Sequence, residues 1–321
     1  MCMYRYIAML VGAASLLLSA SGYAQTYPTR PVKFIVPFPA GPADLLARVY
    51  AQKLAEQAGQ PFLIENRPGA TGTVGTQVVT RAAPDGYTLL ATVDLPMVKA
   101  PSLVKIAYDP AADLIPIAIV AEDFNVLAVH PSVGVKTMAA LAAAAKARPG
   151  SLNFSSAGNG SPGHLCGEMI KGAGGFEMTH VPYSGASPSL TALLSGEVQV
   201  FCGPPGVLLP HITAGTVVGT AVTGDKTSTL LPGVPTIAET WPGVTITNWY
   251  GFFAPTGTPE AVIDILRHEL RRAHENSAVQ RRLQAAGIEP RWLETAASTT
   301  RIRADLVKWA KVVRDANIKA D

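Results

Sequence analysis

Residues 32–44, with the sequence VKFIVPFPAGPAD, form the stretch that decides the fold. Val32–Phe38 is apolar apart from Lys33 and Pro37, which is the pattern of a strand buried on both faces of a parallel sheet. Pro39–Pro42 interrupts this run, and from Asp44 to Gln57 the apolar residues recur on one helical face. The stretch therefore predicts the first β-α unit of an α/β domain.

The rest of the chain repeats this pattern in two series. Strands at 62–65 and 87–93, with a helix between them, complete a β-α-β-α-β opening that is typical of a doubly wound sheet. A second series of strands and helices runs from 125 to 222. After a strand at 245–253 the chain ends in helices with no predicted strand among them, which we expect to pack back on the first series: 259–275, 278–286 and 299–316.

This order predicts an α/β protein of two lobes with a ligand cleft between them. The chain should cross between lobes near 122–125 and 245–249. Lobe 1 would comprise residues 25–124 plus 248–321, and lobe 2 would comprise residues 125–247. About 297 residues in the mature chain suit two domains better than one.

The first 24 residues have the features of a signal peptide. Arg5 supplies positive charge, and Ile7–Leu18 is apolar but too short to span a bilayer. Small residues at positions 22 and 24 predict cleavage after Ala24, and hence secretion. The alternative is an N-terminal anchor that is never cleaved.

Charge and motif spacing argue against several classes of protein. Lysine and arginine total 26 against 23 acidic residues, which is too balanced for a nucleic-acid-binding protein. The GxGxxG at 158–163 has Tyr183 where a dinucleotide site needs an acid, and Pro162 lacks a donor. His268-Glu269 begins a zinc-protease motif, but Arg272 occupies the second histidine position. We expect neither a cofactor nor a metal.

Two cysteines remain after cleavage, Cys166 and Cys202. A secreted chain of this length does not depend on a disulfide for its core, so we expect two free thiols. A bridge stays possible in an oxidising compartment if the two Cα atoms lie within about 7 Å.

A strand, a short Gly/Pro loop and a helix start occur at 36–44 and again at 154–165. The N-terminus of a helix exposes unpaired N–H groups and carries partial positive charge. In open α/β sheets both loops lie at the carboxyl ends of the strands, where ligands bind. Two such loops on facing lobes predict a site that holds a carboxylate from both sides. The alternative is that both loops are only tight turns.

The candidate binding residues lie in these loops and at nearby strand ends. Asp44 is expected to be the N-cap of its helix, with a position facing the cleft as the alternative, and Asp94 carries the same ambiguity. Trp249 and Tyr250 are expected either to form an aromatic wall of the cleft or to pack beside the hinge. The predicted binding residues are Phe38, Pro39, Ala40, Gly41, Ala43, Asp44, Thr92, Asp94, Ser156, Ala157, Gly158, Gly160, Ser161, His164, Tyr183, Cys202, Gly203 and Trp249.

The chain also resembles a known family, the Bug-type extracytoplasmic receptors of tripartite tricarboxylate transporters. The resemblance covers nearly all of the mature chain and rests on eight motifs in order: RPVKFIVPF (30–38), ENRPGA (65–70), PDGYTLL (84–90), GNGSPGHL (158–165), HVPY (180–183), LPHI (209–212), LPGVPT (231–236) and FFAP (252–255). It implies a type II periplasmic binding fold, a periplasmic location and a carboxylate ligand: an amino acid, an aromatic acid, or a di- or tricarboxylate. It also implies a receptor that serves membrane permease subunits. We expect this receptor to be a monomer and not an enzyme.

Three stretches depart from the family pattern. The loop at 38–44 lacks a second glycine, the stretch 92–97 lacks the usual small polar residues, and Cys202-Gly203-Pro204-Pro205 stands where an acid is common. The resulting apolar wall favours an aromatic or aliphatic acid over an amino acid. Two other functions stay open: a hydrolase that uses Ser161 and His164, and a receptor that presents its ligand to a sensor protein.

Overall fold

The computed structural model describes residues 27–228, 230–316 and 318. The predicted signal peptide and its cleavage site after Ala24 lie outside the described residues. Within these ranges no helix has the length and apolar character needed to cross a bilayer.

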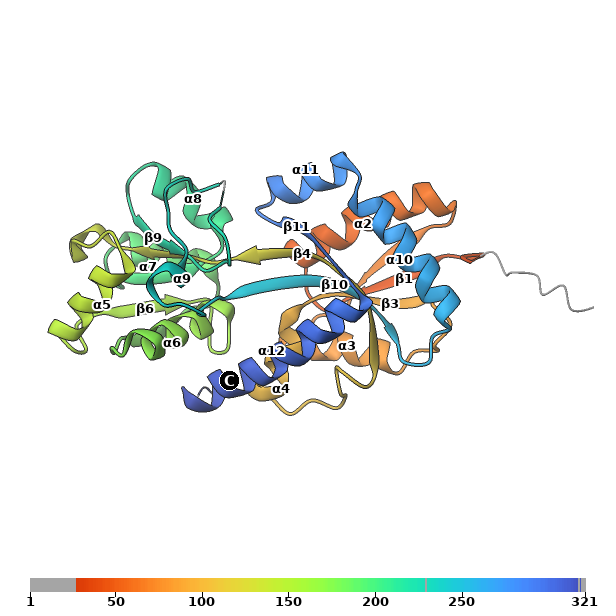
Figure 1. Ribbon diagram of the computed structural model, residues 1–321, viewed down its shortest axis with the longest axis horizontal. Coiled ribbons are helices and arrows are strands. Elements are labelled where there is room, and N and C mark those ends of the chain that lie inside the picture. The colour runs from red at the N-terminus through yellow and green to blue at the C-terminus, as the bar shows by residue number, and fades with distance from the viewer. Residues whose placement is uncertain (1–26, 229, 317, 319–321) are drawn as a thin grey trace, which may run out of the picture.

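A six-stranded mixed sheet forms the centre of the first lobe, which we call lobe 1 (Figure 1). Its strand order is β11-β4-β10-β3-β1-β2; β1 pairs in parallel with β2 and β3, whereas β10 is antiparallel to β3 and β4. The strands are β1 (Val32–Val36), β2 (Phe62–Asn66), β3 (Thr88–Val93), β4 (Leu114–Phe124), β10 (Thr247–Pro255) and β11 (Glu289–Glu294).

Helices cover both faces of this sheet. Side chains along β1 alternate between the two faces, so apolar residues of this strand pack against helices on each side. Phe34 belongs to the apolar cluster that includes α2 and α10, whereas Ile35 belongs to the cluster that includes α3 and α12. The helices of this lobe are α2 (Pro42–Ala58), α3 (Thr73–Thr80), α4 (Ala100–Leu103), α10 (Glu260–His274), α11 (Ser277–Ala285) and α12 (Thr295–Asp315).

A five-stranded sheet of order β7-β6-β8-β5-β9 forms the centre of lobe 2. Its strands are β5 (Val126–Val129), β6 (Asn153–Ser156), β7 (Thr179–Pro182), β8 (Val200–Gly203) and β9 (Val218–Val222). Its helices are α5 (Met138–Ala147), α6 (Pro162–Gly174), α7 (Ala186–Leu194), α8 (Pro205–Thr213) and α9 (Ile237–Thr240). The two α/β sheets confirm the predicted fold class.

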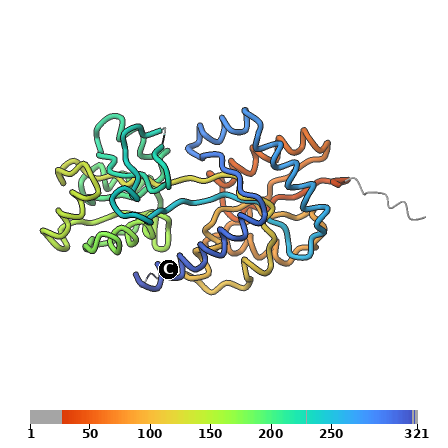
Figure 2. The backbone as a smooth tube through the Cα atoms, in the orientation of Figure 1, coloured from red at the N-terminus to blue at the C-terminus, as the bar shows by residue number. Residues whose placement is uncertain are grey.

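Strands β4 and β10 run side by side from lobe 1 toward lobe 2 (Figures 1 and 2). They pair antiparallel from Leu114↔Pro255 to Phe124↔Thr247. Only Asn125 separates β4 from β5, the first strand of lobe 2. This hydrogen-bonded pair is therefore a principal connection between the lobes and lies beside the cleft.

The C-terminal region contains a strand that was not predicted from the sequence. Strand β11 pairs antiparallel with β4 at the edge of the lobe 1 sheet, so the expectation of helices without a further strand is wrong. Its sequence, EPRWLE, lacks the alternation of apolar and polar residues that marks a strand. The eleven-residue β4, which contains Pro116, is also absent from the predicted elements.

The expectation of two free thiols is wrong, because Cys166 of α6 and Cys202 of β8 form a disulfide. Helix α6 approaches the sheet closely through two glycines. A Cβ added to Gly163 would lie 2.5 Å from the Cys202 carbonyl oxygen, and one added to Gly167 would lie 2.1 Å from the Phe154 ring. This close approach leaves the two cysteine Cα atoms 6.4 Å apart, within bonding range.

Replacing both cysteines with alanine should lower the free energy of unfolding by about 2–4 kcal/mol, because the bridge constrains the unfolded chain. Urea denaturation of the wild-type and double-variant proteins measures this difference. Reducing agent should weaken the wild-type protein and leave the variant unchanged. Alkylation of both Cys166 and Cys202 in the folded, unreduced protein would contradict the assignment.

Candidate functional site

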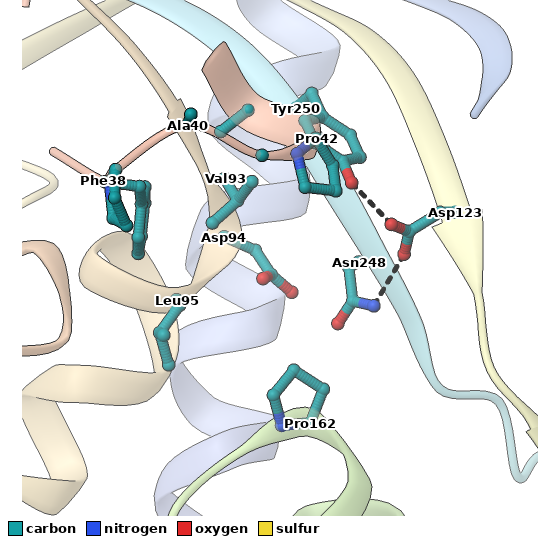
Figure 3. A pocket seen from close by; sticks show the side chains of 13 residues that line it. Phe38, Ala40, Pro42, Val93, Asp94, Leu95, Asp123, Pro162, Asn248 and Tyr250 are labelled. Carbon is teal, nitrogen blue, oxygen red and sulfur yellow. Dashed lines mark hydrogen bonds between the residues drawn. The ribbon is translucent and has the colours of Figure 1, made fainter. Parts of the chain in front are cut away.

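Two adjoining cavities lie between the lobes. The first, of about 300 Å³, is lined mainly by lobe 1, and the second, of about 220 Å³, is lined mainly by lobe 2. Asp123, Asn248 and Pro162 line both cavities, so the two spaces meet at these residues. Figure 3 shows that the first cavity lies between the loop after β1, the end of β3, and strands β4 and β10.

The N-terminus of α2 opens into the first cavity, which Gly41, Pro42 and Ala43 line. Gly41 is the N-cap and supplies no side-chain hydrogen bond to the helix. The first-turn N–H groups of a helix have no partner within the helix, and Pro42 contributes none. The 17-residue α2 therefore presents unpaired donors and partial positive charge to the cavity.

Asp44 lies in the first turn of α2 and is not its N-cap, so the expected capping role is wrong. Its carboxylate accepts hydrogen bonds from Arg48 Nε at 2.8 Å and from Asn66 Nδ2 at 2.9 Å. The hydrogen bond from Arg48 lowers the pKa of Asp44, and burial opposes this change. The Asp44 carboxylate therefore points toward Asn66 of β2, and Asp44 lines neither cavity.

The second loop uses several of its donors internally. The Gly160 N–H donates to His164 Nδ1 at 3.0 Å, and the Gly158 N–H donates to Ser156 Oγ at 3.2 Å. Ser161 is the N-cap of α6, because its Oγ accepts from the His164 N–H at 3.3 Å. The loop is thus ordered by its own hydrogen bonds, and Ala157, Pro162 and Gly163 are the members of this segment that line a cavity.

Two stacked histidines, His164 and His180, hydrogen-bond to the loop between β6 and α6 and to the last residue of β6. The rings of His164 and His180 lie 3.8 Å apart between centroids and are nearly parallel. His180 Nε2 lies 2.7 Å from Ser156 Oγ. Burial, and secondarily the neighbouring His164, lower the pKa of His180 to about 4, so His180 is neutral at pH 7.

A hydrogen-bonded chain of polar residues leads from the core of lobe 1 to the cavities, and Figure 3 shows its end, where Asn248 and Tyr250 bond to Asp123. Lys99 Nζ lies 2.7 Å from Asp94 Oδ2 and donates to Asn248 Oδ1 at 2.7 Å. Asn248 Nδ2 donates to Asp123 Oδ1 at 2.6 Å, and the Tyr250 hydroxyl donates to Asp123 Oδ2 at 2.5 Å. The buried ion pair therefore fixes the orientation of Asn248, which in turn fixes Asp123 at the junction of the cavities.

Burial dominates the electrostatics of the two carboxylates. Asp94 is 1% exposed, and burial raises its pKa to about 6 although the Lys99 ammonium opposes this change. Burial also raises the pKa of Asp123, against the hydrogen bonds from Tyr250 and Asn248. Both carboxylates consequently bear a cost of ionisation that an added positive charge would reduce.

Trp249 and Tyr250 are neighbours on β10 and point to opposite faces of the sheet. Tyr250 lines the first cavity. Trp249 is 0% exposed, and its Nε1 donates to Asp305 Oδ2 of α12 at 3.0 Å. The expected cleft wall at Trp249 is therefore corrected: Trp249 packs between the sheet and α12, and Tyr250 takes the position at the cleft.

The remaining predicted residues fall into two groups. Members that line a cavity are Phe38, Pro39, Ala40, Gly41, Ala43, Asp94, Ala157 and Cys202. Thr92 and Gly203 are buried in strands, and the Tyr183 hydroxyl donates to Glu197; none of these three lines either cavity.

Three polar residues on the two crossing segments line the cavities but were not predicted from the sequence: Asp123, Asn125 and Asn248. They fall within the segments where the chain was predicted to cross between lobes. Polar residues within a predicted crossing segment were therefore the feature of the sequence that could have identified these cavity-lining positions. Among the described residues no group of three or more histidine, cysteine or acidic side chains is arranged to hold a metal ion.

Asp94→Asn should change how stability depends on pH. The pKa of Asp94 rises from 3.8 to about 6 on folding, so its contribution to stability is full below pH 3.8 and is lost as pH rises through 6. The wild-type protein should lose about 3 kcal/mol relative to the variant between pH 3.5 and pH 7.5. Urea denaturation at several pH values measures this, and a difference that is constant with pH would contradict it.

Comparison with known proteins gives a consistent result. A family model described as "Tripartite tricarboxylate transporter family receptor" matches residues 46–318. Protein BugT of Bordetella pertussis is 35% identical over 307 residues, which cover 94% of each chain.

Solved structures of similar sequence have the same fold. A protein of R. palustris solved with adipate is 33% identical, with a TM-score of 0.77, and the match covers 91% of this chain and 99% of that one. MatC from Rhodopseudomonas palustris, solved with bound malate, is 31% identical, with a TM-score of 0.73 and coverage of 89% and 100%. The resemblance found in the sequence is therefore confirmed: the chain belongs to the receptor family of tripartite tricarboxylate transporters, whose members are solute receptors and not enzymes.

Proposed function

We propose that this protein is a periplasmic receptor that captures a small carboxylate in the interlobe cleft and delivers it to the membrane permease subunits of its transporter. The uncapped N-terminus of α2, which lines a cavity of about 300 Å³, is the observation that carries this proposal. The predicted signal peptide supports the periplasmic location. The adipate and malate in the two similar structures support a carboxylate ligand.

The cavity can bind the carboxylate of a ligand at the N-terminus of α2, and it presents an apolar surface to the carbon chain of the same ligand. Charge-assisted hydrogen bonds to backbone N–H groups contribute about 1.5–3 kcal/mol each. Phe38, Val93, Leu95 and Tyr250 provide the apolar side chains of the wall. Across the cleft, Pro162 of lobe 2 lines the same cavity, and the Ser161 hydroxyl beside it is a candidate to approach the ligand when the lobes close.

Closure would use the connection formed by β4 and β10. We propose that residues 25–124 plus 248–321 and residues 125–247 move as the two rigid parts of a monomer. Strands β4 and β10 pair from Leu114↔Pro255 to Phe124↔Thr247 with two shifts of register, and the chain passes from β4 to β5 through Asn125 alone. A bend confined to this crossing would bring Pro162 toward the N-terminus of α2, and the closed form would be the one that the permease recognises.

A thermal-shift screen of carboxylic acids, beginning with adipate and malate, tests the proposal. A ligand at about 100 times its dissociation constant should add about 2.7 kcal/mol of stability, a shift on the order of 5 °C. The methyl ester of a hit should lose most of this shift because it lacks the charge. An ester that binds as tightly as the acid would place the carboxylate elsewhere.

Gly41→Val should abolish the shift, because its side chain would cover the N-terminus of α2. Gly41 has an extended backbone that any residue can adopt, and an added Cβ would meet only the Pro39 carbonyl oxygen at 3.9 Å, so the variant should fold. Gly172→Val, at an exposed position of α6 that lines neither of the two cleft cavities, is the matched control, since its Cβ meets nothing within 4 Å. Gly160 is less suitable because its φ of 71° disfavours valine. Normal binding by Gly41→Val would refute this site.

A further inference from the structure

The cleft carries more negative charge than a site for a simple carboxylate requires. Among the described residues that line the two cavities, Asp94 and Asp123 are the charged ones. Lys99 compensates one of them, as its Nζ lies 2.7 Å from Asp94 Oδ2. Of the cations on α12, Arg301 is paired with Glu122 at 3.3 Å and with Asp305 at 2.8 Å, and Lys308 Nζ donates to the Thr245 carbonyl oxygen. In the part of the chain that the structure describes, no lysine or arginine forms an ion pair with Asp123.

Asp123 is positioned to receive a ligand. Its two carboxylate oxygens each accept one hydrogen bond from β10, from Asn248 Nδ2 and from the Tyr250 hydroxyl. An ionised carboxylate can accept about four hydrogen bonds, so acceptor capacity remains. The side chain is partly exposed and lines both cavities where they meet (Figure 3). The carboxylate is thus held rigidly by its neighbours and open toward the cleft.

A second polar group points to a ligand in the adjoining cavity. Asn125, two residues further along the chain, is 4% exposed and lines the second cavity. Its Nδ2 is buried and donates to no group in the part of the chain that the structure describes. Buried donors are almost always paired, so this one calls for an acceptor atom that a ligand in the cavity can supply.

We propose that Asp123 selects a ligand with a protonated amino group, so that the solute is an amino acid. Its carboxylate binds the N-terminus of α2, its ammonium group binds Asp123, and a further oxygen accepts from Asn125. This inference rests on the proposed function, because it adds the amino group to the same site. It reverses the preference predicted from the sequence, in which the apolar stretch at 202–205 favoured an acid without an amino group.

Matched ligand pairs test the proposal by isothermal titration at pH 7.5. Each amino acid of a panel is compared with the acid that lacks only its amino group, such as aspartate with succinate and glutamate with glutarate. The best amino acid should bind at least tenfold more tightly than its partner. If acids without the amino group bind as well or better, the inference is overturned and the carboxylate receptor stands. If no member of any pair binds, the proposed function falls as well.

Asp123→Asn keeps the size of the side chain and removes its charge. The variant should lose the tenfold preference and should bind the acid without the amino group at least as well as the wild-type protein does. Asp264→Asn, which removes an exposed carboxylate of α10 paired with Arg267, is the matched control and should keep the preference. Thermal unfolding without ligand checks that both variants fold. A preference that survives Asp123→Asn overturns the inference.

Asn125→Ala tests the third contact in the same assay. It should lower the affinity of the best amino acid about tenfold and leave the tenfold preference over its partner in place, since Asp123 is unchanged. An unaltered affinity would remove Asn125 from the proposed site. A lost preference with an intact Asp123 would show that the ammonium group is not bound where we place it.

Discussion

The antiparallel pairing of β4 with β10 is the interaction on which the rest of the structure depends. Both strands lie inside the sheet of lobe 1, between β11 and β3, and both continue toward lobe 2. Their register places Asp123 opposite Asn248 and Ala121 opposite Tyr250. One ladder of backbone hydrogen bonds therefore connects the lobes and also brings together the polar side chains at the centre of the cleft.

The buried charges of lobe 1 contribute more to the orientation of side chains in the cleft than to the stability of the protein. A buried ion pair is weak evidence for stability, because the loss of hydration offsets most of the attraction between the charges. Lys99 and Asp94 nevertheless fix the amide of Asn248, since Lys99 Nζ donates to its Oδ1. With that oxygen engaged, the amide nitrogen faces Asp123. The pair thus defines which way the polar groups of the cleft present their donors and acceptors.

The two loops that flank the cleft are similar in sequence pattern and different in what they offer a ligand. The N-terminus of α2 has no side-chain cap, whereas α6 is capped by Ser161 and its loop donates to Ser156 and His164. Helix α6 is further held by its close packing on β8 and by the disulfide from Cys166 to Cys202. Lobe 2 therefore presents a rigid surface, and lobe 1 supplies most of the open donors.

The sequence by itself determined the α/β class, the two series of strands and helices, the loop at Phe38–Ala43 and the family. These features depend on local periodicity, on turn residues and on motif order, all of which lie within short segments. Only the tertiary structure decided the disulfide, the burial of Trp249 and the position of Asp123 where the two cavities meet. Each of these features depends on how elements that are remote in the chain pack together. The disulfide depends on the packing of α6 on β8, the burial of Trp249 on that of β10 on α12, and the position of Asp123 on the pairing of β4 with β10. Such distances follow from packing and strand register, which a pattern within one segment does not specify.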